Sequence, residues 1–165
     1  MVMFLLAGLV YRSQGQSTED TNSVLALQTE LTRILIDKDT TKFLSLIGPL
    51  GVTFGVDGDN QFKEQIVEQF DQKRDAYCFL FDSKCLSRET PARKREPLRP
   101  CSVHDLVSRA DGWSMEHQTG QRDGKSQIYL TLKPNNELCS NGKDPLEFVF
   151  TQFEGGWKLV AVPYT

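Results

Sequence analysis

Apolar positions in the first half of the chain recur at helical spacing. Over residues 21–36 they lie three or four positions apart, which places them on one stripe of an amphipathic helix. A second, shorter helix is expected through residue 47, with Thr40 or Thr41 as its cap. A third is expected over residues 61–74. The apolar stripe of the first helix consists of Val24, Leu27, Leu31, Ile34 and Leu35.

Alternation of apolar and polar residues replaces this spacing in the last third. Trp113, Met115 and His117 share one face of a strand expected over residues 113–119. The dipeptide Asp123-Gly124 is a hairpin turn signal that follows this strand. Three further strands are expected over residues 125–132, 146–153 and 157–162. The four strands predict an antiparallel meander.

The middle of the chain gives a mixed pattern. Short strands are expected over residues 51–55 and over the aromatic run 77–81. Residues 87–100 hold three prolines and many charges, which is typical of an exposed loop. Residues 102–105 form a capping-box pattern, with Asp in place of the usual Glu, and predict a short helix through about Arg109.

The order of these elements predicts the fold class. Helices in the first half and a meander in the second indicate an α+β fold, in which N-terminal helices pack on a curved four-stranded antiparallel sheet. A chain of 165 residues with 39% hydrophobic residues suits one domain, expected over residues 16–165 with an exposed basic loop at 87–100. The net charge of −3 is too small to indicate nucleic acid or an anionic membrane as a partner.

The N-terminal residues predict export. Residues 2–10 form an apolar or small-residue run of signal-peptide length, and no run reaches the roughly 18 residues that a spanning helix needs. Ser13 and Gly15 are small residues where a signal peptidase reads, so we expect a signal peptide over residues 1–15 and a secreted or periplasmic location. No Lys or Arg precedes the run, and an ordinary first strand or helix is the alternative.

The cysteines favour the same location. There are four, and none forms a C-x-x-C pair of the kind found in zinc knuckles or thioredoxin-type motifs. Of the three pairings, Cys78–Cys85 and Cys101–Cys139 are favoured, because the first closes a short loop and the second ties the central loop to a late one. The alternative is four reduced thiols in a cytosolic protein.

Several of these segments resemble a known superfamily. The segment "GPLGVTFG", the helices around it and the final hairpin "FVFTQFEGGWKLVAV" are similar to the NTF2-like, cone-shaped α+β superfamily, over about residues 21–162. The same elements are similar to small exported bacterial domains without an assigned activity. The resemblance implies a pocket between sheet and helices. Trp157 is expected to be a core residue of the last hairpin. The resemblance implies no particular chemistry, because members include isomerases, dehydratases and binding domains.

Two histidines are candidates for proton transfer. If the apolar face of its strand lines a pocket, His117 is a candidate base and Tyr77 a candidate hydrogen-bond donor. His104 is next to Asp105 in the sequence, but adjacent helical side chains point in different directions and do not form a dyad.

Charged segments offer binding surfaces rather than chemistry. Arg93, Lys94 and Arg95 lie in the basic loop and are candidate contacts for an anion or an acidic partner. The turn at residues 57–59 resembles the start of a calcium loop, but Phe62 stands where that loop needs Gly. No metal site is therefore expected.

The sequence thus favours an exported, non-catalytic binding or accessory domain. Its partner is open, either a small apolar ligand or a protein, and neither a cofactor, nucleic acid nor a membrane span is expected. The alternative is a small-molecule acid–base enzyme of the isomerase or dehydratase type, which would use His117 and Tyr77 in a pocket between sheet and helices.

Overall fold

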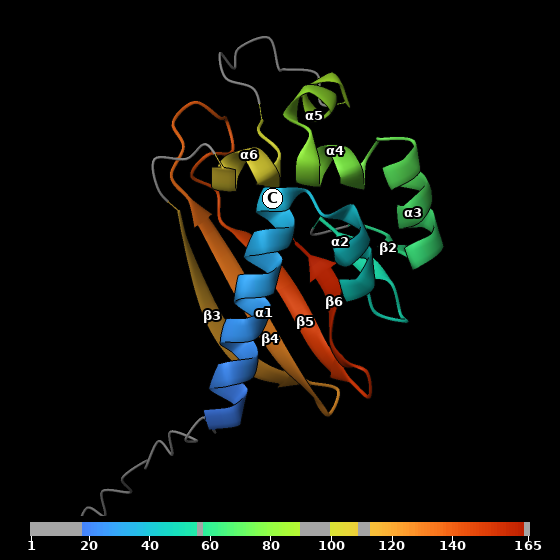
Figure 1. Cartoon of the computed structure of the whole chain (residues 1–165), viewed down its shortest axis with the longest axis vertical. Helices are drawn as coiled ribbons and strands as arrows, with labels where there is room; N and C mark the ends of the chain where they lie inside the picture. The colour runs from blue at the N-terminus through green and yellow to red at the C-terminus, as the bar shows by residue number, and fades with distance from the viewer. Residues whose placement is uncertain (1–17, 56–57, 90–99, 109–112, 164–165) are drawn as a thin grey trace, which may run out of the picture.

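The computed structural model describes residues 18–55, 58–89, 100–108 and 113–163. The predicted signal peptide, the turn residue Asp57 and residues 90–99 of the predicted basic loop lie outside these ranges. The described chain forms helices that cover one face of a curved, mixed sheet (Figure 1). This is the predicted α+β class.

The first two helices form where their sequence spacing indicates. Helix α1 (Thr18–Asp37) crosses one face of the sheet, and all five residues of its predicted apolar stripe are buried at 6% exposure or less. Helix α2 (Thr40–Leu46) follows directly, but its cap is Asp39 rather than Thr40 or Thr41. The backbone N–H of Lys42 donates to Asp39 Oδ1 at 3.0 Å, because a carboxylate is the stronger acceptor for an unpaired helix N–H.

Four short helices follow, and two were not predicted. They are α3 (Lys63–Asp71), α4 (Ala76–Phe81), α5 (Ser83–Glu89) and α6 (Val103–Ser108). The strand expected over residues 77–81 was wrong, because this segment is α4. Helix α5 also takes in residues 87–89, which were expected in the basic loop. Within the described ranges, no helix combines the length and the apolar character that crossing a membrane requires.

Helix α4 shows why a short apolar run is ambiguous. Most of its side chains are buried, and such a run reads the same in a buried strand and a buried helix. A residue of α3 stabilises its first turn, since the backbone N–H of Ala76 donates to Gln69 Oε1 at 3.1 Å. The buried side-chain amide of Gln69 therefore caps α4 from seven residues away.

The sheet has six strands in the order β2-β1-β6-β5-β4-β3. Strands β3 to β6 form the predicted antiparallel meander, and a parallel β1 and the short β2 extend it beyond β6. The predicted turn at Asp123-Gly124 has positive φ at both residues and joins β3 to β4. The strands are β1 (Val52–Phe54), β2 (Asn60–Gln61), β3 (Trp113–Arg122), β4 (Lys125–Pro134), β5 (Leu146–Phe153) and β6 (Gly156–Val162).

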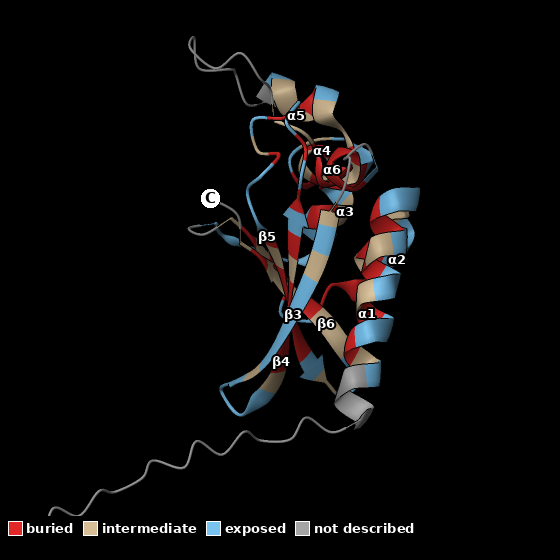
Figure 2. Cartoon of the chain, turned by 90° about the vertical axis from the view of Figure 1, so that its left-hand side faces the viewer, coloured by how far each residue is buried: buried red, intermediate tan, exposed pale blue. Residues whose placement is uncertain are grey.

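The core lies between the helices and the inner face of the sheet, which is the face toward α1 (Figure 2). Its large aromatic residues come from both layers: Phe43 and Phe81 from helices, and Phe148 and Phe150 from β5. Trp157, expected in the core, is half-buried and packs against it from the start of β6.

Two disulfides tie the described elements together. Cys78 is bonded to Cys85 and Cys101 to Cys139, with Cα–Cα distances of 5.1 and 5.5 Å. This is the pairing favoured from the sequence. The first bond joins α4 to α5, and the second joins the residue before the α6 cap to the β4–β5 connection.

Candidate functional site

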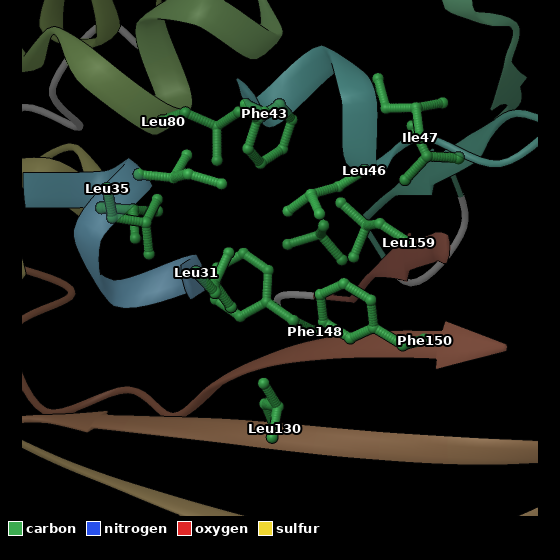
Figure 3. Packing of buried hydrophobic residues seen from close by; sticks show 14 of the residues in the cluster. Leu31, Leu35, Phe43, Leu46, Ile47, Leu80, Leu130, Phe148, Phe150 and Leu159 are labelled. Atoms are coloured by element: carbon green, nitrogen blue, oxygen red, sulfur yellow. The ribbon is translucent and has the colours of Figure 1, made fainter. Parts of the chain in front are cut away.

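The space between helices and sheet, where the family resemblance implies a pocket, is filled. Leu31 and Leu35 of α1, Phe43 of α2, and Phe148 and Phe150 of β5 meet there with 0% exposure (Figure 3). A side chain that borders a cavity large enough for water keeps accessible surface, and these five have none. They therefore line no opening.

His117 lies on the predicted face of its strand but outside the core. It pairs with the fully buried Leu130, so it shares the inner face, and Trp113 and Met115 on that face pack against the core. His117 itself is exposed, because β3 is the edge strand and, among the described residues, pairs with a neighbouring strand on one side only. The predicted face of the strand is thus correct, but His117 is not buried as a catalytic base in a pocket would be.

Tyr77 lies elsewhere, on α4. Its ring packs against Phe70 at 5.9 Å and Phe81 at 5.8 Å between centroids, and it is half-buried. Helix α4 lies near α3, whereas β3 is the opposite edge of the sheet from β1 and β2 (Figure 1). The structure does not bring Tyr77 and His117 together around one cavity.

His104 forms a hydrogen bond between α6 and α1. Its Nδ1 lies 2.9 Å from the carbonyl oxygen of Leu35 and 3.3 Å from Ser108 Oγ. Since a carbonyl only accepts, Nδ1 carries a proton and donates to Leu35. His104 therefore holds α6 against the end of α1, and it makes no dyad with Asp105.

A buried polar cluster surrounds the start of α6. Ser102 is fully buried, and its Oγ accepts from the backbone N–H of Asp105 at 3.3 Å, as the capping-box pattern predicted. The shorter Asp105 does not complete the box directly. Instead, Ser83 Oγ accepts from the backbone N–H of Ser102 at 2.7 Å and donates to Asp105 Oδ2. The cluster docks α5 on α6 and contains no histidine, so it is a cap rather than a Ser-His-Asp triad.

An open hollow lies at the outer face of the sheet, beside the β5–β6 turn. Its volume is about 640 Å³, and its floor includes Phe153 with the Lys125 ammonium 4.4 Å above the ring centroid. Lys158 donates from Nζ to the carbonyl oxygen of Ser45 at 2.9 Å. The lining residues are Pro49, Lys125, Gln152, Phe153, Glu154, Gly155 and Lys158.

The hollow offers charged and apolar contacts to a ligand. Its two ammonium groups face one carboxylate, Glu154, and it holds neither a histidine nor a nucleophilic hydroxyl or thiol. This hollow was not predicted from the sequence, although the expected strand pairing points to it. The expected pairing of strands 125–132 and 146–153 places residue 125 opposite residue 153, next to the turn residues of the last hairpin.

The predicted basic loop is described only in part. Arg93, Lys94 and Arg95 fall outside the described residues, while Arg88 of the same loop is exposed on α5. No group of three or more His, Cys, Asp or Glu side chains placed to hold a metal occurs in the described part of the chain.

No protein-family model matches the chain, and no curated protein matches it. Among solved structures, an NTF2-like protein from Cytophaga hutchinsonii is 10% identical, covering 91% of this chain and 98% of its own, with a TM-score of 0.46. A protein of unknown function with a cystatin-like fold from Nostoc punctiforme is 15% identical, covering 90% and 91%, also at 0.46. A variant of Rd1NTF2 is 16% identical, covering 87% and 99%, again at 0.46. The chain is similar in fold to NTF2-like structures, as the sequence resemblance predicted.

Proposed function

We propose that this chain is an exported, non-catalytic binding domain whose binding surface is the hollow beside the β5–β6 turn. The observation that carries the proposal is the filled interior, where core side chains of α1, α2 and β5 have no exposed surface: Leu31, Leu35, Phe43, Phe148 and Phe150. An enzyme of this architecture needs a pocket that encloses its substrate. The surface of the domain is therefore where it meets its partner.

The polar side chains considered for catalysis have other roles. His117 is exposed on the edge strand, and Tyr77 packs in an aromatic cluster. Ser83, Ser102 and Asp105 hydrogen-bond to one another or to the backbone at the start of α6. These contacts hold elements of the fold together, whereas acid–base chemistry requires a base within reach of a bound substrate.

The hollow suits a protein partner with an acidic side chain. It is open to solvent, whereas small-molecule sites bury most of their ligand. Lys125 and Lys158 outnumber Glu154, and the ring of Phe153 supplies an apolar contact between them. A carboxylate of the partner would reach Lys125 while an adjacent apolar side chain covers the ring.

Two features support export. The N-terminal apolar run has signal-peptide length, and both disulfides are of the kind that persist in an oxidising compartment. A domain that leaves the cytoplasm without a catalytic pocket suits a role as an accessory module for another exported protein.

The proposal is tested by crosslinking in cells that naturally make the protein. A photo-crosslinking amino acid replaces the exposed Gln152 in the hollow, and Glu30 on α1 serves as the control position. We expect one adduct from residue 152 that Lys125→Glu reduces and Lys125→Arg retains, because Arg keeps the charge. An adduct formed equally from residue 30, or one unaffected by Lys125→Glu, contradicts the assignment of the hollow.

A further inference from the structure

We propose that the exposed edge strand β3 pairs with β3 of a second copy of the chain. The pairing is antiparallel and centred on residue 119, so that the two sheets join into one across a two-fold axis. This dimer uses the edge strand β3, whereas the binding hollow lies beside the β5–β6 turn; the two adjoin where Arg122 pairs with Lys125.

The two edges of the sheet differ in length. One edge is β2, with two residues, and very short edge strands resist pairing with other chains. The other edge is β3, with ten residues that pair continuously with β4 and include neither a proline nor a register shift. Its residues from Glu116 to Thr119 are exposed. A long, regular edge of this kind is a template for strand addition.

The charges on β3 select one register. Glu116 and Arg122 are six residues apart, so both lie on the outer face of the sheet. In an antiparallel pair centred on residue 119, Glu116 of each copy lies opposite Arg122 of the other. The two-fold axis creates this contact twice. A shift of two residues places Glu116 opposite a glycine, and a shift of one places it opposite a side chain of the other face.

The existing contacts of both residues are compatible with this pairing. Glu116 Oε2 lies 2.7 Å from Lys133 Nζ, and a carboxylate accepts from more than one donor. Arg122 is 76% exposed and makes a loose contact of 3.8 Å with Asp123, while its guanidinium carries five N–H groups. In the dimer, Glu116 would lie between Lys133 and Arg122 of the second copy.

The charge pairs set the register, and the backbone supplies the attraction. Exposed ion pairs contribute little to affinity, whereas like charges placed opposite one another are strongly unfavourable. The interface is short, so we expect a weak dimer that dissociates on dilution.

The test is sedimentation velocity over a concentration series that reaches about 1 mM, where weak complexes are populated. We expect wild-type protein to dimerise with increasing concentration. Glu116→Arg and Arg122→Glu should each weaken the dimer at least tenfold, because both create like-charge contacts across the axis. Mixed one to one, the two variants should regain wild-type association, since every contact then joins an Arg to a Glu. Glu30→Arg, an equal charge change at an exposed position of α1, should leave association unchanged.

Circular dichroism and unfolding midpoints establish that each variant is folded. Hydrogen exchange on the wild type gives a readout without any variant, since β3 amides should gain protection as concentration rises. A wild type that stays monomeric overturns the proposal, as does a mixture that associates no better than either variant alone.

Discussion

At the scale of single residues, Asp82 fixes the start of α5. Its Oδ1 accepts from the backbone N–H groups of Lys84 at 2.9 Å and Cys85 at 3.1 Å. These hydrogen bonds, chiefly the one from Cys85, lower the pKa of Asp82 below its ordinary value of 3.8. The folded-state pKa thus lies below the unfolded one. The stabilisation is complete above the unfolded value and is lost as pH falls through the folded value.

We predict that Asp82→Ala lowers the free energy of unfolding by about 1 kcal/mol near neutral pH, as removal of a helix cap does. The difference from wild type should shrink in acid, where the carboxyl of the wild type is protonated. Asp82→Asn is the matched control, because it keeps an acceptor that does not titrate. Denaturant unfolding at neutral pH and at about pH 2 measures both effects. An Asp82→Ala deficit that is as large in acid as at neutral pH would rule out the carboxylate as the cap.

At the scale of elements, the two disulfides should differ in their effect. In the chain-entropy model a cross-link stabilises more when it closes a longer loop. Cys78–Cys85 spans seven positions and Cys101–Cys139 spans 38. The second bond also holds the start of α6 to the β4–β5 connection, where Asn141 Oδ1 accepts from the backbone N–H of Cys101 at 2.9 Å.

We predict that replacing Cys101 and Cys139 together by Ala costs about 4 kcal/mol, against about 2.5 kcal/mol for Cys78 and Cys85. Equilibrium unfolding of the two double variants measures the difference, and peptide mapping of each establishes that the remaining bond is intact. A larger loss from the seven-position bond would show that strain or packing around α4 outweighs chain entropy.

Elements with a clear pattern of apolar positions were predicted correctly from the sequence. The apolar stripe of α1 recurs at helical spacing, and β5 places Leu146, Phe148 and Phe150 on one face, so both elements were predicted close to their observed bounds. Residues 77–81 lack a period, because most of their side chains are buried, and there the strand prediction was wrong.

The contacts between distant residues were harder to predict. Ser83 completes the cap of α6 from 19 residues away, and no local pattern specifies that partner. Likewise, β3 alternates correctly, but its place at the sheet edge, which exposes His117, depends on how all six strands are ordered. Sequence periodicity thus gives the face of a residue, and tertiary topology decides its burial.

At the scale of the whole molecule, aromatic residues decide whether the fold encloses a pocket. Phe43, Phe148 and Phe150 occupy the space between the helices and the sheet, together with leucines from α1. Smaller residues at these positions would leave an apolar cavity, because a packed core collapses only partly around a deleted side chain. The function proposed for this domain therefore depends on this interior being filled.

Xenon binding to crystals of the protein tests this claim most directly, since xenon enters apolar cavities that water leaves dry. Leu31→Ala is the positive control, because deleting a fully buried leucine side chain from α1 should create a cavity beside Phe148. We predict no xenon between α1 and the sheet of the wild type, and an ordered xenon site there in Leu31→Ala. Xenon bound beside Phe148 and Phe150 in the wild type would reveal an interior pocket and contradict a function confined to the surface.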